Sequence, residues 1–156
     1  MISIIGSGPA GNYAAYLLAK DGQQVQVFEE NSVIGDPIQC TGIVTSSIAD
    51  MVPMKNEFIV NRIKKARIFS PDNNFIEIKL GNDNIILNRR RFDQHIAELA
   101  QDAGAELHAN HRFLDFKDNE MHIKDTNGNT VKKLKTNVLI GADGPNSQVA
   151  KAAGLF

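Results

Sequence analysis

The sequence has one cysteine, no long apolar run and almost no excess of either charge. With Cys40 as the only thiol, an internal disulfide and a cysteine cluster for a metal are both excluded. Seventeen Lys and Arg against eighteen Asp and Glu give a net charge of -1, so the chain as a whole has no electrostatic attraction for nucleic acid. The apolar runs are far shorter than the roughly 20 residues of a membrane-spanning helix. No secretory signal follows Met1, so we expect a cytoplasmic protein without a nucleic-acid partner.

The remaining composition is that of an ordinary globular protein, with 42% hydrophobic and 22% charged residues. A chain of 156 residues has the typical size of one domain and is long enough to bury a core. It contains no internal repeat, low-complexity stretch or linker-like segment. The sequence therefore predicts a single domain over residues 1–156.

The N-terminal residues have the pattern of a β-α-β unit. Residues 2–5 form a β-branched run typical of a buried strand, and residues 25–28 form a second one. Between them Pro9 is placed where the first turn of a helix tolerates proline. We expect one face of this helix to be lined by Ala10, Ala14, Leu17 and Leu18. A short crossover of this kind implies parallel strands in one sheet.

Farther along the chain, short apolar runs alternate with turn sequences. Strands are predicted over 67–69, 75–78, 85–87, 113–116, 121–124, 130–134 and 138–140. Helical spacing of apolar residues predicts helices over 92–103 and 147–152. Turns are predicted at 71–74 and 81–84, and Asn127-Gly128 indicates a type I′ hairpin. The expected fold class is α/β, with a parallel sheet and antiparallel β-meander insertions.

A glycine-rich turn follows the first predicted strand and opens the first predicted helix. Gly6, Gly8 and Gly11 complete the pattern G-x-G-x-x-G, in which the second glycine lets a pyrophosphate approach the backbone. The helix N-terminus offers free N–H groups and a positive dipole end to that anion. Glu29 ends the second strand, where its carboxylate can bind both hydroxyls of an adenosine ribose and disfavours a 2′-phosphate. These features together predict a dinucleotide site.

Two charged groups elsewhere have both a binding and a structural interpretation. Arg89, Arg90 and Arg91 crowd the start of a predicted helix, where a nearby pyrophosphate would offset the unfavourable dipole interaction. The alternative is a solvated basic cluster. Asp143 lies in a glycine-rich turn after a buried strand, and its carboxylate would suit ribose hydroxyls or pyrophosphate-bound water. The alternative for Asp143 is a helix N-cap.

Cysteine and histidine offer little further chemistry. Cys40 lies in a Gly/Pro-rich loop, not on an apolar periodic face, although a lone cysteine is often a small buried hydrophobic residue. His108 and His111 have H-x-x-H spacing but no third ligand nearby, so no metal site is predicted.

Four segments in order resemble the FAD-dependent geranylgeranyl reductase family, which belongs to the flavoprotein group sharing the fold of para-hydroxybenzoate hydroxylase. They are the glycine-rich turn with Glu29, residues 34–43 with a Pro-x-x-Cys-x-Gly stretch, residues 88–93 with Arg-x-x-Phe-Asp, and residues 141–151 with Asp-Gly. The resemblance implies a Rossmann-like FAD-binding domain. It implies FAD-binding positions at Gly6, Gly8, Pro9, Ala10, Gly11, Glu29, Cys40, Arg89, Phe113, Asp143 and Gly144. Arg89 would clamp the pyrophosphate, and Cys40 would lie near the flavin ring and help deliver a proton.

The same resemblance implies an oxidoreductase that reduces C=C bonds of geranylgeranyl or other polyprenyl chains in lipid or pigment biosynthesis. An external donor, NAD(P)H or ferredoxin, would supply electrons, and a prenyl substrate implies peripheral contact with a membrane. The alternatives are an aromatic-type flavin monooxygenase and a non-catalytic dinucleotide-binding fragment.

Full members of this family are longer and carry a C-terminal substrate domain. The chain therefore resembles the N-terminal part of such a flavoprotein, and we expect it to be inactive alone. We also expect uncovered apolar surface on the meander and the last helix, which favours association.

Overall fold

The computed structural model describes residues 1–155 and, for Asn82, the backbone alone. Residue 156, where the predicted domain ends, lies outside the described part. The chain divides into two compact units, one of Met1–Pro37 with the residues from Asp93 onward and one of Ile38–Phe92. Within residues 1–155, no helix has the length and apolar character that crossing a bilayer requires.

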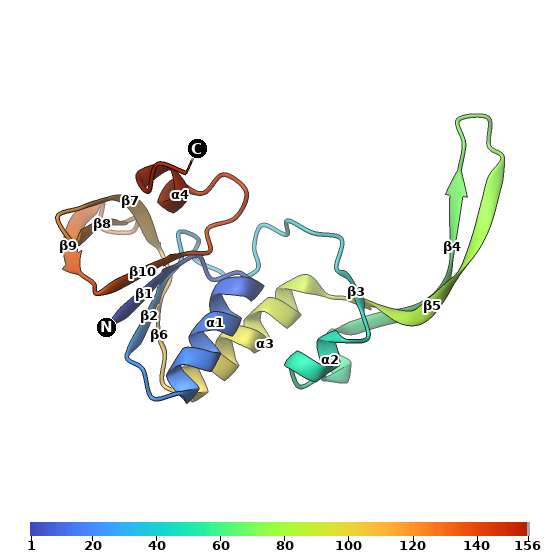
Figure 1. The fold of residues 1–156 in the computed structure, drawn as a ribbon, viewed down its shortest axis with the longest axis horizontal. Coiled ribbons are helices and arrows are strands. Elements are labelled where there is room, and N and C mark those ends of the chain that lie inside the picture. Colours follow the sequence, from blue (N-terminus) through green and yellow to red (C-terminus); the bar gives the residue numbers. More distant parts are fainter. Residues whose placement is uncertain (156) are drawn as a thin grey trace. The chain divides into compact units, whose positions relative to one another are not determined.

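The first unit contains a four-stranded sheet of β1 (Ile2–Ile5), β2 (Val25–Phe28), β6 (Glu106–His108) and β10 (Val138–Gly141). The strand order is β10-β1-β2-β6, and all neighbours are parallel (Figure 1). Chain connections leave β1 toward β2 on one side, while β10 lies on its other side. Ligands of such sheets bind outside the carboxyl ends of the strands at this switch point. The predicted α/β fold with a parallel sheet is confirmed.

The helices α1 (Pro9–Lys20) and α3 (Arg89–Asp102) contribute small side chains to the core of this sheet. That core is formed by Ile4, Ala15, Ala19, Val25, Val27, Ala100 and Ala105. The predicted buried face of α1 was wrong at two positions, because Ala10 and Leu17 are exposed. The buried residues are Gly11, Asn12, Ala15 and Ala19. Gly11 and the alanines allow the helix backbone to lie close to the sheet, and this close approach determines which face is buried.

A second, antiparallel sheet in the same unit consists of β7 (His111–Lys117), β8 (Glu120–Asp125) and β9 (Thr130–Lys135). Its buried side chains join those of β1 and β2 in a second core formed by Ile5, Phe28, Phe113, Met121 and Ile123. The short helix α4 (Gln148–Ala152) contributes Val149 to this core. The predicted antiparallel insertions are therefore present.

The type I′ turn lies in a different hairpin from the predicted one. Asp118 and Asn119 join β7 to β8, and both have positive φ, 52° and 61°, as a type I′ turn requires. Between β8 and β9 the loop has four residues, 126–129, and only Asn129 has positive φ. There the Asp125 side chain accepts hydrogen bonds from the N–H groups at 127 and 128. This Asx-type bonding stabilises the longer loop.

The second unit contains β3 (Ile43–Thr45), α2 (Ile48–Met51), the 3-10 helix η1 (Asn56–Phe58), β4 (Ile59–Phe69) and β5 (Phe75–Leu87). The strand order is β3-β5-β4, and all pairs are antiparallel. The turn predicted at 81–84 is wrong, because β5 continues through it. Lys65 pairs with Lys79 and Ile63 with Asn84, so the extra residues of β5 form a bulge opposite Lys64.

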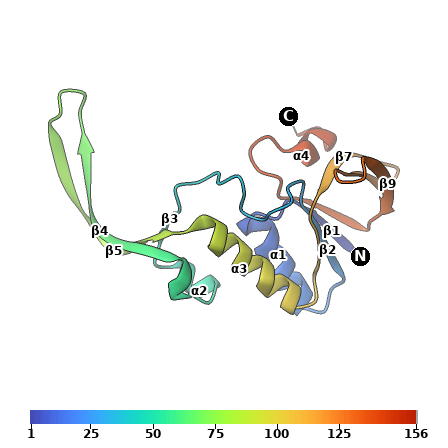
Figure 2. The same ribbon diagram turned by 180° about the vertical axis from the view of Figure 1, so that it is seen from behind.

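The end of the β4–β5 hairpin is a two-stranded ribbon formed by 65–69 and 75–79, because β3 pairs only with residues 84–86 of β5 (Figure 2). Two cross-strand apolar pairs occupy it, Ile68 with Ile76 and Phe69 with Phe75. Their four side chains are 51–61% exposed. The expected exposed apolar side chains are thus present on the meander.

Replacing Phe69 and Ile76 together with serine is expected to remove most of the binding of an apolar fluorescent dye, because contiguous apolar surface binds such dyes. Dye fluorescence and sedimentation at several protein concentrations measure the effect. Val131 is 57% exposed, and Val131→Ser is the matched control on β9. If the Phe69/Ile76 double variant and Val131→Ser bind equal amounts of dye, the dye-binding apolar surface lies outside the ribbon.

Candidate dinucleotide site

The turn between β1 and α1 contains three glycines with three different surroundings. Gly6 has φ 101°, and a Cβ there would collide with the Ala142 carbonyl. A Cβ at Gly11 would collide with the carbonyl oxygen of Gly6. A Cβ at Gly8 would meet nothing within 4 Å. Packing therefore requires glycine at the first and third positions, whereas the second glycine leaves open space beside the backbone.

The N-terminus of α1 has no side-chain cap. Gly8 is the N-cap residue and Pro9 is at the start of the helix. In an α-helix the first N–H groups have no partner within the helix, so those of Ala10 and Gly11 are directed out of its end. Together with the helix dipole they form a site for an anion.

A buried asparagine holds the turn from the inside. Asn12 is 0% exposed, and its Nδ2 donates to the carbonyl oxygen of Ser7 at 2.8 Å. The Ser7 hydroxyl donates to Asn12 Oδ1, also at 2.8 Å. Asn12 was not among the residues predicted from the sequence. The available signal was a polar side chain in the first turn of a helix, one position after the third glycine.

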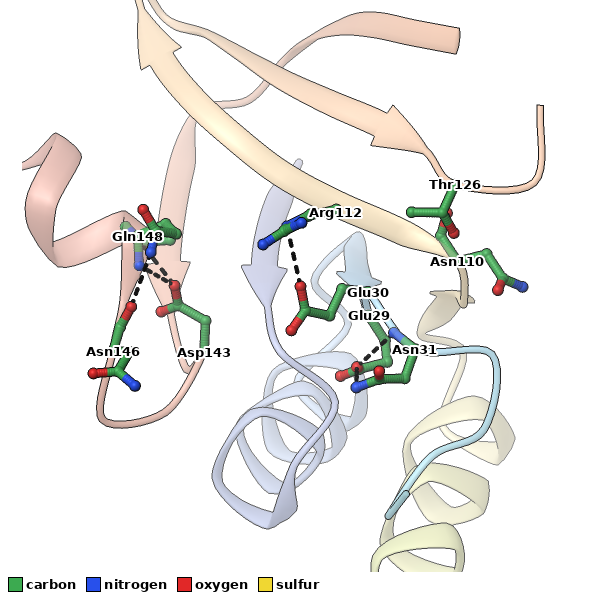
Figure 3. A network of polar contacts seen from close by, with 10 residues as sticks. Glu29, Glu30, Asn31, Asn110, Arg112, Thr126, Asp143, Asn146 and Gln148 are labelled. Carbon is green, nitrogen blue, oxygen red and sulfur yellow. Dashed lines mark hydrogen bonds and ion pairs between the residues drawn. The ribbon is translucent and has the colours of Figure 1, made fainter. Parts of the chain in front are cut away.

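Glu29 lies directly after β2 and is bonded to the glycine-rich turn. Its Oε2 accepts from the Ser7 N–H at 2.8 Å. Its Oε1 accepts from the N–H and the side-chain amide of Asn31, both at 2.9 Å (Figure 3). An ionised carboxylate has about four acceptor sites, so binding two ribose hydroxyls requires one donor to leave. The Asn31 side chain is the donor that can rotate away.

Asp143 and Gly144 lie in the turn after β10, which contacts the glycine-rich turn through Ala142. Asp143 accepts from the N–H groups of Gln148 and Val149 at 2.6 and 3.2 Å, and from the Ser147 hydroxyl at 2.5 Å. These contacts hold Asp143 beside the N-terminus of α4, but the N-cap residue of that helix is Ser147, whose hydroxyl accepts from the Ala150 N–H. The interpretation of Asp143 as the N-cap is therefore wrong. Gly144 has φ 78° with open space around it. Cofactor contacts of Asp143 and Gly144 stay predictions.

Phe113 differs from the other predicted site residues of the first unit because its side chain is in the second core, 4% exposed. Its side chain is therefore used for packing. A cofactor contact at Phe113 stays a prediction.

Cys40 and Arg89 belong to the second unit. The Cys40 thiol is exposed, so the interpretation as a small buried hydrophobic residue is wrong. A hydrogen bond from the Gly42 N–H lowers the pKa of the Cys40 thiol, and the positive charge of Arg89 lowers it further. Gly42 has φ 78°, and its missing Cβ leaves room for Arg89 and the Leu87 carbonyl. The structure thus joins Cys40 and Arg89 in one local group.

Because thiolate is the reactive form of cysteine, Cys40 is expected to react with iodoacetamide at neutral pH faster than an ordinary thiol does. Its lowered pKa means that reactivity is retained as the pH falls below the usual thiol range. Arg89→Gln removes one cause of the lowered pKa and should slow alkylation severalfold, with Arg62→Gln as the control. An alkylation midpoint at the ordinary thiol pKa would contradict this assignment.

The two histidines of the H-x-x-H sequence pack against Phe28. The rings of Phe28 and His108 are stacked, with their centroids 5.0 Å apart. The ring centroid of His111 lies 5.7 Å from that of His108. Burial lowers the pKa of His108, and the nearby His111 adds to this effect. Among residues 1–155 no group of three or more His, Cys, Asp or Glu side chains could hold a metal.

The arrangement in the first unit fits a dinucleotide. An uncapped helix end, open space at Gly8 and a carboxylate bonded to the same turn meet at the carboxyl ends of β1 and β2. These are the groups that bind pyrophosphate and ribose.

Comparison with known proteins extends this interpretation. A protein of Methanosarcina barkeri, the uncharacterized protein in the nifH2 5′ region, is 36% identical over 99% of this chain and 87% of its own length. The digeranylgeranylglycerophospholipid reductase of Methanosarcina acetivorans is 32% identical over 99% of this chain and 40% of its own length. A crystal structure of a geranylgeranyl bacteriochlorophyll reductase-like protein from Thermoplasma acidophilum superposes with TM-score 0.81 at 28% identity, covering 92% of this chain and 38% of that one.

This chain thus spans most of the first relative and about two fifths of the reductase. The sequence model of the family described as FAD binding domain matches residues 1–156. The fold, the glycine-rich turn and this match agree, and FAD is the cofactor that they indicate. The chain belongs to the FAD binding domain family.

Proposed function

We propose that the chain is the FAD-binding part of an FAD-dependent oxidoreductase that reduces C=C bonds of geranylgeranyl or related polyprenyl chains. The observation that carries this proposal is the similarity of nearly the whole chain to a digeranylgeranylglycerophospholipid reductase, at 32% identity. The open glycine-rich turn supports it from the structure. The product would belong to lipid or pigment biosynthesis.

Six of the predicted residues have a role in this proposal. The N–H groups of Ala10 and Gly11 bind the pyrophosphate, Gly8 leaves room for it, and Glu29 binds the adenosine ribose. Bound FAD supplies the hydride chemistry, while the protein orients and tunes it. Arg89 neutralises phosphate charge. Cys40 holds a proton at its Sγ, and the hydrogen bond from the Gly42 N–H, which lowers the pKa of the thiol, makes that proton easier to release.

The partners follow from the same chemistry. A prenylated lipid or pigment is the substrate, and NAD(P)H or ferredoxin is the external donor. The protein works in the cytoplasm, with peripheral contact at a membrane where the prenyl substrate resides. Because the glycine-rich turn and Glu29 both lie in the first unit, we expect the chain to bind FAD.

Two alternative functions were left open by the sequence analysis, and each predicts a different experimental result. An aromatic-type flavin monooxygenase would consume oxygen when a donor is oxidised. A non-catalytic dinucleotide-binding fragment would bind adenine nucleotides and would catalyse neither lipid reduction nor hydroxylation. The reductase names among the relatives favour the first proposal.

The test begins with the visible absorption spectrum of the purified chain after incubation with FAD and removal of the excess. Retained flavin bands are expected. The flavin-loaded protein is then reduced and mixed with a digeranylgeranyl lipid, with and without the remaining part of a relative's reductase. Reoxidation of the flavin with hydrogenated lipid as the product, seen by mass spectrometry, supports the proposal. Oxygen consumption without lipid hydrogenation contradicts it.

A further inference from the structure

The corner between β6 and β7 is fastened to the residues that follow β2. The Glu29 N–H donates to the His108 carbonyl at 2.9 Å, and the His111 N–H donates to the Glu29 carbonyl at 2.7 Å. The Asn110 N–H donates to the Asn31 carbonyl at 3.2 Å. These backbone bonds place the start of β7 directly beside the ribose-binding carboxylate.

Arg112, the second residue of β7, forms an ion pair with Glu30. Its Nε lies 3.2 Å from Glu30 Oε2, and Figure 3 shows the pair close to Glu29. The two side chains are 60% and 56% exposed. Ion pairs this exposed add little to stability, so the Arg112 guanidinium can take up a ligand at little cost to the fold.

The order of groups in a dinucleotide determines what lies here. In adenosine the ribose separates the phosphate from the base. The glycine-rich turn receives the phosphate, and Glu29 is bonded to that turn through the Ser7 N–H. A ribose on Glu29 therefore directs adenine away from the turn, toward the residues that follow Glu29 and the start of β7. Glu30 and Arg112 are the charged side chains paired there.

The geometry points to Arg112 as an adenine-binding residue of the FAD site, with Glu30 as the residue that positions its guanidinium. This inference rests on the proposed FAD binding. The planar guanidinium stacks on aromatic rings, whereas a lysine ammonium does not offer such a plane. Arg112 could instead pair with a 2′-phosphate, but the Glu29 carboxylate in the ribose position disfavours that group.

The experiment measures the affinity of the flavin-free chain for ADP, FAD and 2′-phospho-ADP-ribose by calorimetry. Arg112→Ala is expected to weaken ADP and FAD binding by the same factor, about five- to tenfold, because the two ligands share adenosine. Arg112→Lys should restore little of this loss, and Glu30→Gln should weaken binding less than Arg112→Ala. Arg67→Ala is the matched control, since Arg67 forms a similar exposed pair with Glu77 at 3.0 Å.

The outcomes separate this inference from the proposed function. Wild-type affinity of Arg112→Ala for ADP overturns the inference, as does weakened FAD binding without weakened ADP binding. Tighter binding of 2′-phospho-ADP-ribose than of ADP overturns it in favour of a phosphate site. A Tm lowered by Arg112→Ala and not by Arg67→Ala, with restored affinity at lower temperature, assigns Arg112 a structural role only. If the chain binds ADP in the expected pattern and retains no FAD, the proposed function fails while the adenine site stands.

Discussion

Gly8→Val is expected to weaken FAD binding strongly while leaving the fold intact. Gly8 has φ -77° and ψ 179°, an extended conformation that any residue adopts, and a Cβ there meets nothing within 4 Å. The valine side chain would occupy the open space through which a pyrophosphate approaches the helix end. We expect the Kd for FAD to rise at least about a hundredfold, which corresponds to roughly 3 kcal/mol.

Flavin fluorescence quenching gives the affinity, and a thermal melt gives the Tm of the same sample. Gly81→Val is the control, because a Cβ at Gly81 also meets nothing within 4 Å and Gly81 lies in β5. Unchanged FAD affinity in Gly8→Val would exclude this turn as the pyrophosphate site.

Gly11→Ala is expected to have the opposite profile, with a large loss of stability. Alanine usually stabilises a helix by about 1 kcal/mol relative to glycine. At this position, however, the new Cβ would collide with the Gly6 carbonyl oxygen and lie 3.2 Å from Ala142 Cβ. A backbone oxygen cannot rotate away as a flexible side chain can, so we expect a net loss of about 1–3 kcal/mol, as for other overpacked sites.

A thermal melt should show a Tm lower by roughly 3–10 °C for a chain of this size. Gly8→Ala is the matched control within the same turn, since its Cβ has open space, and its Tm should stay near that of the wild type. A Tm for Gly11→Ala at or above the wild-type value would contradict the packing derived for this turn.

Features carried by contiguous residues were predictable from the sequence. The strand, glycine-rich turn, helix and second strand of residues 2–28 follow from local patterns, and the structure confirms them. In contrast, β6 is a three-residue strand with two polar residues, Glu106 and His108. It is a strand because it pairs with β2, and no local pattern encodes that partner.

The candidate site shows the same division. The sequence identified Glu29 but not its donors, because Ser7 and Asn31 meet it only in the folded turn. Asp118-Asn119 forms the type I′ turn although Asn127-Gly128 is the stronger signal. The strand register permits two residues in the first hairpin loop and four in the second, so tertiary pairing overrides the local preference.

The pairing of β1 with β10 has a consequence for the order of folding. Ile2 lies opposite Val138, and the Ala142 carbonyl fills the space that a Gly6 side chain would need. Closing so long a loop is slow relative to forming local contacts. During synthesis from the N-terminus, the glycine-rich turn therefore acquires its final support only after the residues of β10 have emerged. We therefore expect flavin capture to be a late event that requires β1 and β10 to have paired.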